Sequence, residues 1–343
     1  NIRATDGANV AGGETRTSDR FLIDWQAGTS FSNDVNSFGY EALFADEGAL
    51  DFHLKSRFGR FDPATGMFTT NDTETSRLID LGDPTASYAN EPANNGNRIN
   101  VGLYGNTVEA SKSSGQRSLI PLTLSDGGTV RGDVHLYWAW NSMAGNTLLY
   151  ADYSWDGGST WTNIATNVYA DVGSSDEGWL WSTTNFPSTA QGVWRICTDD
   201  GEVCGQTETY FAVKNDPVSY YINDGSTNGD VYCSTRGLST NTGLSSNSPM
   251  TSVETLMNRY KVEHGDTIYV DTGIYPRSSP LVISIPSVSP TNYLIIRGST
   301  NEAAGGTVFT NAGGSVLGLQ NVDKVELRDL RLHGGSQGLQ LSQ

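Results

Sequence analysis

One loop of the chain, residues 224–230, carries oxygen-bearing side chains at alternate positions around its glycines. These side chains belong to Asp224, Ser226, Asn228 and Asp230. Such spacing is typical of calcium-binding loops, although position twelve of the pattern is Thr235 instead of a bidentate glutamate. The loop therefore predicts either a calcium site, calcium being the one cofactor that the sequence suggests, or an ordinary turn rich in Asp and Asn.

A serine motif of hydrolytic enzymes is matched at residues 334–338. Gly334, Ser336 and Gly338 fit the pattern G-x-S-x-G, and His333 precedes them. In α/β-hydrolases this serine lies on a tight turn between a strand and a helix. Residues 339–341 alternate as a strand does. We therefore expect a turn between two strands, and we assign no catalytic residue in the chain.

Two of the three cysteines are placed to form a disulfide. Cys197 and Cys204 flank an Asp-Gly turn, which would bring two strands and both sulfur atoms face to face. A disulfide indicates an oxidising, extracellular or cell-surface location. The spacing disfavours a metal site, because no histidine or third cysteine lies nearby at ligand spacing. Cys233 is left over, either free and buried or paired outside the sequence.

Residues 154–161 follow the pattern S-x-D-x-G-x-T-W and resemble the Asp-box of sialidases and related propellers. In that motif the aspartate caps its own turn and the tryptophan packs beneath it. A propeller needs several copies, whereas this chain has one. We therefore expect a structural hairpin here and no catalysis.

Length, composition and charge restrict the classes of protein. The 343 residues allow two or three domains, and 39 glycines indicate frequent turns between short strands. The 38 acidic and 21 basic side chains give a formal charge of −17, which repels nucleic acid and anionic lipid. No stretch reaches the roughly 18 apolar residues of a membrane span. We expect neither a nucleic-acid partner nor a membrane span.

The tryptophans are concentrated in the middle of the chain, where seven of eight lie within residues 138–194. Polar segments at 110–115 and 214–217 bound this region. Apolar residues alternate from Val134 to Trp140, which predicts a strand with one buried face. About seven short strands predict a β-sandwich of immunoglobulin or fibronectin type III kind over residues 115–214. The candidate strands are 118–124, 134–140, 147–155, 160–168, 178–183, 192–198 and 207–213.

One short amphipathic helix is predicted after Pro249. Thr251 precedes Glu254 by three residues, as in a capping box. Four apolar side chains would then share one helical face: Val253, Leu256, Met257 and Tyr260. Beyond Tyr260 the sequence shows no second helix, because its brief apolar runs are broken by Gly, Asn and Pro.

Strand-like runs near the end of the chain repeat at a regular spacing. Ile295, Leu317 and Leu339 lie 22 residues apart, which predicts a solenoid in which each repeat is one coil. Residues 220–275 resemble the opening of right-handed parallel β-helix domains of the pectate-lyase-like superfamily, in which the predicted helix would cap the first coil. The stretches that carry this resemblance are 221–226, 243–245, 264–270 and 273–275.

The first 112 residues resemble the last coils and exit tail of β-helix domains in very large, repetitive, secreted bacterial surface proteins. The matching stretches are 51–56, 61–66, 79–84 and 98–107. We therefore expect an all-β chain in three parts. Residues 1–112 would be the C-terminal coils and exit tail of one β-helix, residues 115–214 an immunoglobulin-like sandwich, and residues 218–343 the cap and first coils of a second β-helix. The chain would then be a window on a longer polypeptide.

This architecture favours a structural role. We expect an extracellular structural or adhesive segment of a large repetitive cell-surface or filament-forming protein, because sandwiches and solenoids build length without an active site. Its partners would be further copies or adjoining repeats stacked on open β-helix ends, together with cell-surface polysaccharide. The alternatives are a polysaccharide lyase or glycoside hydrolase whose catalytic coils lie outside this sequence, and a carbohydrate-binding module.

Overall fold

The computed structural model describes residues 9–11, 14–16, 21–28, 37–174, 178–215, 218–285 and 292–342. The regular secondary structure of the described residues is mostly β-strand, which confirms the prediction of an all-β fold class. The α-helices are α1 (Leu22–Gly28) and α2 (Val253–Arg259), and short 3-10 helices span Ala170–Ser174 and Glu302–Ala304. The prediction of a single helix is wrong. Helix α1 is 7 residues long, and its Ile23 is buried in the core of the middle strands.

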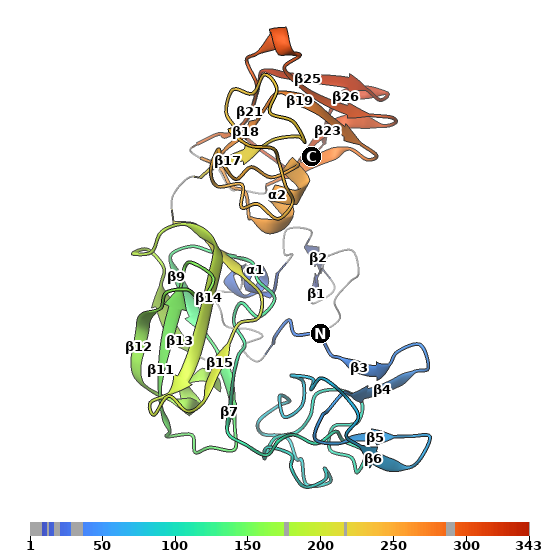
Figure 1. The fold of residues 1–343 in the computed structure, drawn as a ribbon, viewed down its shortest axis with the longest axis vertical. Coiled ribbons are helices and arrows are strands. Elements are labelled where there is room, and N and C mark those ends of the chain that lie inside the picture. The colour runs from blue at the N-terminus through green and yellow to red at the C-terminus, as the bar shows by residue number, and fades with distance from the viewer. Residues whose placement is uncertain are drawn as a thin grey trace.

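The strands fall into three groups along the chain (Figure 1). Residues 37–112 lie at the lower right of that view, residues 118–213 at the left, and residues 219–342 at the top. Helix α2 lies on the side of the top group that faces the middle group.

Ten strands build the middle group. They are β7 (Ser118–Pro121), β8 (Thr129–Val130), β9 (Asp133–Leu136), β10 (Trp138–Asn141), β11 (Leu148–Ser154), β12 (Thr162–Tyr169), β13 (Trp179–Ser182), β14 (Thr189–Thr198), β15 (Cys204–Gln206) and β16 (Phe211–Val213). One sheet has the order β12-β11-β14-β16-β8, with β15 paired to β14, and two further pairs are β10-β7 and β13-β9. The pairing of β16 with β8 is parallel, and the other pairings in this group are antiparallel.

Aromatic side chains fill the core between these strands. Trp138 and Trp194 are fully buried, and each indole nitrogen finds a carbonyl acceptor. Trp138 Nε1 donates to Ala170 O at 3.0 Å, and Trp194 Nε1 donates to Thr123 O at 2.9 Å. Because a buried indole N–H without a partner is costly, these two bonds fix the rings in place.

The strand predicted from Val134 to Trp140 is buried on both faces, so the prediction of one buried face is wrong. The strand is interrupted at Tyr137, where β9 pairs with β13 and β10 pairs with β7. Tyr137 and Ala139 point away from the aromatic core but are buried as well, because they pack against Leu81 of the first group. The first group therefore covers the outer face of these strands.

In the first group, the described strands form antiparallel hairpins. Strand β3 (Phe44–Asp46) pairs with β4 (Asp51–Leu54), and β5 (Arg60–Asp62) pairs with β6 (Met67–Thr69). Before them, β1 (Asn9–Ala11) pairs with β2 (Glu14–Arg16), also antiparallel.

The prediction of β-helix coils in residues 1–112 is therefore wrong for the described part, because coils pair in parallel. The physical reason is local turn chemistry. Gly66 N donates to Asp62 O at 2.8 Å, and Gly66 has a φ of 68°, so this tight turn returns the chain beside the strand that it has just left.

Ten strands build the third group. They are β17 (Ser219–Ile222), β18 (Thr267–Val270), β19 (Gly273–Arg277), β20 (Leu281–Ser284), β21 (Leu294–Gly298), β22 (Thr307–Asn311), β23 (Ser315–Gln320), β24 (Val325–Arg328), β25 (Leu330–Gly334) and β26 (Gln337–Ser342). They form three parallel sheets with the orders β17-β18-β21-β24, β19-β22-β25 and β20-β23-β26. From β18 onward, the chain visits the three sheets in the same order in every pass, so each pass adds one layer to all three.

The 22-residue period reflects only part of this arrangement. Leu317 in β23 lies opposite Leu339 in β26, but Ile295 belongs to a different sheet and lies opposite Glu326. In the sequence, residues 285–293 separate β20 from β21, whereas only residues 321–324 separate β23 from β24. Because these connections differ in length, a constant spacing cannot hold for every strand.

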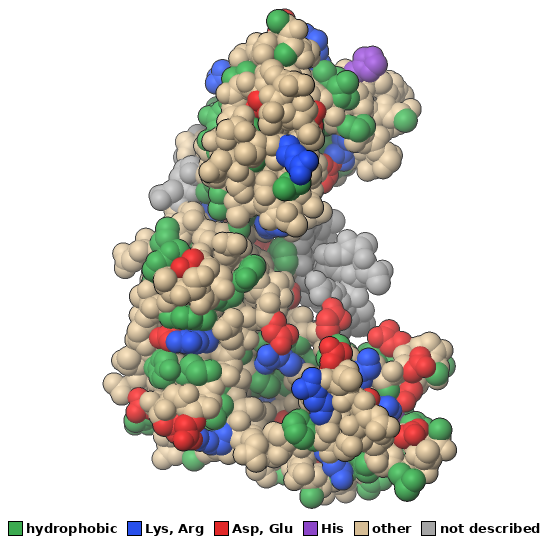
Figure 2. Space-filling view, viewed as in Figure 1, with side chains coloured by type: hydrophobic (Ala, Val, Ile, Leu, Met, Phe, Trp, Pro, Cys, Tyr) green, Lys and Arg blue, Asp and Glu red, His purple; other side chains and the backbone are tan. Residues whose placement is uncertain are grey.

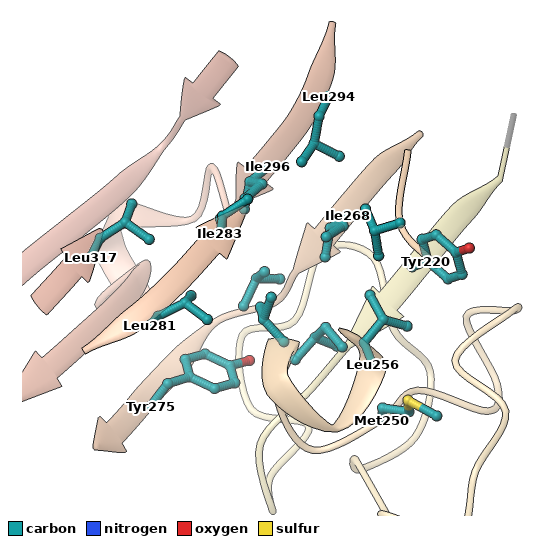
Figure 3. Packing of buried hydrophobic residues seen from close by; sticks show 14 of the residues in the cluster. Tyr220, Met250, Leu256, Ile268, Tyr275, Leu281, Ile283, Leu294, Ile296 and Leu317 are labelled. Atoms are coloured by element: carbon teal, nitrogen blue, oxygen red, sulfur yellow. The ribbon is translucent and has the colours of Figure 1, made fainter. Parts of the chain in front are cut away.

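The first layer of the third group is covered by α2 and the loop before it. Met250 forms a parallel bridge to Ile222, with Met250 N donating to Tyr221 O at 2.9 Å. Val253 and Leu256 of α2 are buried in the core. Figure 3 shows Met250 and Leu256 at one end of this core and Leu317 at the other.

Helix α2 begins one residue later than a cap at Thr251 would require. Ser252 is the N-cap, and its Oγ accepts a hydrogen bond from Thr255 N at 3.2 Å. Glu254 is then too early in the helix to complete the capping box, and it forms an ion pair with Arg277 of β19 instead.

Candidate functional site

The end of the parallel sheets opposite α2 is uncovered within the described part of the chain. Strands β24, β25 and β26 are the last of their sheets, and no described strand pairs with their outer edges. Figure 1 shows β25 and β26 on the side of the group away from α2. Outer edges of this kind leave backbone N–H and C=O groups free to pair with another strand.

Apolar side chains of the last layer are more exposed than their partners in the layer before it. Ile296 is buried, whereas its partner Leu327 is only half-buried. The change is larger in the third sheet, where Leu341 lies opposite half-buried Leu319 and is 71% exposed. Figure 2 shows hydrophobic side chains on the surface of this upper group. The hydrophobic column of the core therefore continues to the surface at this end.

Charged side chains flank the uncovered end. Arg328 Nε lies 2.5 Å from Glu326 Oε1 within β24, and Arg297 Nε lies 3.4 Å from Asp329 Oδ2 in the next layer. Such exposed pairs contribute well under about 1 kcal/mol each. They make the rim of the end polar while its centre stays apolar.

The loop that predicts a calcium site or a turn is held by bonds among its own residues. Asp224 Oδ1 accepts from Ser226 N at 2.7 Å, and Ser226 Oγ accepts from Asn228 N at 3.1 Å. Asp230 Oδ2 accepts from Asn223 Nδ2 at 2.6 Å, while Asp230 Oδ1 is buried without a hydrogen-bond partner. Burial is the main cause that raises the pKa of Asp230 to about 6.

These contacts agree with the turn alternative. Among the described residues, no three His, Cys, Asp or Glu side chains gather in a group that could hold a metal ion. The calcium site stays a prediction, for which thermal unfolding with and without a chelator is the test.

Asp271, which is not among the residues predicted from the sequence, anchors this loop. It is fully buried just after β18, and its carboxylate accepts from Val231 N, Tyr232 N and Cys233 N at 2.7, 2.7 and 2.6 Å. The signal that was available is an aspartate that directly follows a buried apolar strand. Its role is to hold the loop against the first layer of the sheets.

The predicted disulfide is confirmed. Cys197 and Cys204 are bonded, and they lie opposite each other in the antiparallel pair β14 and β15. Cys233 is buried and free, and burial raises the pKa of its thiol, so it is a poor nucleophile.

The sialidase-like sequence forms the turn between β11 and β12. Asp156 Oδ1 accepts from Ser154 Oγ and from Thr160 N at 2.7 and 2.8 Å. These and similar bonds, the one from Ser154 first, lower the pKa of Asp156 to about 2. Trp161 lies under the guanidinium of Arg195, 4.1 Å from Arg195 Cζ to the ring centroid. The carboxylate is therefore engaged in shaping a hairpin.

The G-x-S-x-G sequence forms the turn between β25 and β26, as expected. Ser336 N and Oγ both donate to Gly314 O, at 2.8 and 3.2 Å. Strand β26 follows at once, so Ser336 does not lie on the strand-to-helix turn of a hydrolase nucleophile.

A cleft of about 840 Å³ lies between the first and middle groups, away from all the residues singled out in the sequence. Arg77 and Glu208 meet across it, with Arg77 Nε 2.5 Å from Glu208 Oε1. Tyr40 also lines the cleft, but its hydroxyl donates to Pro121 O at 2.5 Å and the Arg77 guanidinium lies over its ring. Arg77 and Glu208 therefore pair with each other at this cleft.

Comparisons of the chain with models of protein families, with curated proteins and with solved structures return no match. In the described residues, neither α1 nor α2 has the length and apolar character to cross a membrane.

Proposed function

We propose that this chain is an extracellular structural segment of a large repetitive surface or filament-forming protein. In this proposal, residues 218–343 are the capped start of a right-handed parallel β-helix of the pectate-lyase-like kind, and residues 115–214 are an immunoglobulin-like spacer. The observation that carries the proposal is the contrast between the two ends of the parallel sheets, because α2 covers one end and no described element covers the other.

The uncovered end offers both of the interactions that stabilise an added strand, namely backbone hydrogen bonds and burial of apolar side chains. Three parallel edges provide backbone hydrogen-bonding groups, and exposed leucines provide apolar surface. Burying one leucine side chain contributes about 1.5–3 kcal/mol. A further layer with apolar side chains in register with Leu339 and Leu341 would gain from both interactions.

The geometry limits which partner can supply that layer. An adjoining repeat can continue the parallel pairing. A free second copy can offer only its own uncovered end, because α2 and Met250 cover the other end of the sheets. Two copies would therefore meet end to end about a two-fold axis, which gives a closed dimer.

The disulfide supports an extracellular location, because such bonds persist in oxidising compartments. The formal charge of −17 favours the solubility of a long exposed chain.

Sedimentation of the full chain over a range of concentrations tests the proposal. We expect the weight-average mass to rise toward that of a dimer in the wild type. Leu341→Lys places a charge in the contact and should keep the chain monomeric. Leu103→Lys is the matched control, because Leu103 is 70% exposed but lies in the first group, and it should associate as the wild type does. A wild type that stays monomeric, or equal association of both variants, contradicts the claim that the uncovered end takes a further layer from another copy.

A further inference from the structure

The middle and third groups meet at a buried lysine and a buried aspartate. Lys214 directly follows β16 and its side chain is 4% exposed, while Asp266 directly precedes β18 and its side chain is 1% exposed. Lys214 Nζ lies 2.5 Å from Asp266 Oδ2. The amine also donates to Lys261 O at 3.1 Å and to Glu263 Oε2 at 3.4 Å.

The carboxyl group of Asp266 is fixed on both oxygens. Its Oδ1 accepts from Val218 N at 2.9 Å, and its Oδ2 accepts from Glu263 N at 2.9 Å. The amine and the carboxyl group are therefore held in contact with little freedom to move apart. Glu263 reaches the same amine, and its carboxylate lies 3.7 Å from Arg131 Nη1 on its other side.

We propose that Lys214 and Asp266 join in an intramolecular amide crosslink, with Glu263 as the group that relays a proton. In the first step, one proton passes from Nζ to Oδ2 across the contact between the two groups, which gives the neutral amine and acid. The amine lone pair then attacks the carboxyl carbon. Val218 N–H donates to Oδ1, where negative charge develops during this attack.

The reaction balances without any further reactant. One C–N bond forms and one C–O bond breaks. Glu263 accepts a second proton from Nζ and delivers it to the departing Oδ2 hydroxyl, which leaves as water. The amide keeps one N–H, for which Lys261 O remains an acceptor, and its carbonyl Oδ1 keeps the bond from Val218 N.

Such a crosslink would tie together residues 52 positions apart and join the middle strands to the parallel sheets by a covalent bond. It would hold this junction under a pulling force that an ion pair does not resist. The inference is independent of the proposed function, because it concerns the junction and not the uncovered end.

The mass of the intact full chain, unfolded and with its disulfide reduced, tests this proposal. We expect the wild type to be lighter than its sequence by one water molecule. Lys214→Arg keeps the positive charge beside Asp266 but lacks a nucleophilic amine, and it should have the full sequence mass. Glu263→Gln should form the crosslink about 100-fold more slowly, which is the size expected for loss of a proton relay.

Peptide mapping of the wild type locates the bond without relying on a variant that has to fold. Digestion should release one branched peptide that contains both Lys214 and Asp266. A wild type with its full sequence mass overturns the proposal. A water loss that persists in Lys214→Arg, or that maps to an Asp-Gly sequence such as Asp156-Gly157, overturns it as well.

Discussion

Leu339 lies directly opposite Leu317 in the same parallel sheet, yet Leu317 is 1% exposed and Leu339 is 42% exposed. The two side chains have the same identity and the same position in successive layers. They differ because Leu317 also has Leu281 opposite it on its other side, whereas Leu339 has a described neighbour on one side alone. Burial in this group therefore depends on a layer above and a layer below, and the last described layer has a described neighbour on one side alone.

Ser252 and Thr251 make different contributions to stability, although both could cap a helix by sequence. Ser252→Ala removes the acceptor of Thr255 N at the start of α2, and we expect the free energy of unfolding to fall by about 1 kcal/mol. Thr251→Ala is the matched control, because Thr251 lies outside the cap. It should lower the free energy of unfolding by only a few tenths of the loss expected for Ser252→Ala. Urea unfolding of both variants measures this. Equal losses would show that the cap position is wrong.

The disulfide stabilises the middle group by closing a loop with a sequence separation of 7. In the chain-entropy description, a loop of this size contributes about 2.5 kcal/mol. We expect the free energy of unfolding of the double variant Cys197→Ala/Cys204→Ala to be lower than that of the wild type by this amount. The double variant should therefore unfold at a lower denaturant concentration. Adding a reductant should lower the stability of the wild type and leave the double variant unchanged. A response of the double variant to the reductant would contradict the assignment.

The Asp80 carboxyl makes the first group less stable as the pH rises. Burial, the main cause, raises its pKa from 3.8 to about 7, helped by Glu91. The folded chain then holds a proton that the unfolded chain loses, so the stabilisation is complete below about pH 4 and is lost as the pH rises through 7.

Asp80→Asn removes this dependence. Between pH 5 and pH 8, the free energy of unfolding of the variant should rise by on the order of 3 kcal/mol relative to that of the wild type. Thermal unfolding at both pH values measures the difference. Asp83→Asn is the control, because the Asp83 carboxylate is exposed and its hydrogen bonds with Thr85 lower its pKa. The difference in the free energy of unfolding between this variant and the wild type should therefore stay the same over this pH range. If the difference between Asp80→Asn and the wild type is also the same at both pH values, the raised pKa of Asp80 is refuted.

Local patterns in the sequence predicted the elements whose partners are near in the chain. The Asp156 turn and the Cys197–Cys204 hairpin were predictable because turn chemistry and register lie within a few residues. Helix α2 was found from its apolar face, with an error of one residue at its cap.

Pairing direction was not predictable for the first group. The strand Asp51–Leu54 has the same short apolar character whether its neighbour is parallel or antiparallel, and the choice is made by a turn or by a distant partner. The burial of Tyr137 was likewise not predictable from the residues next to it in the sequence, because it depends on the distant Leu81. Asp271 was missed because its partners, the backbone N–H groups of residues 231–233, carry no sequence signal.

Hydrogen exchange at the outer edge of β26 tests the central claim most directly. The amides of residues 337–342 should exchange more slowly at high than at low protein concentration, as strand addition buries them. The amides of β18, which lie inside the stack, should not change. An exchange rate for β26 that is independent of concentration, or a slowing confined to other parts of the chain, would contradict the claim that this end receives a further layer of strands.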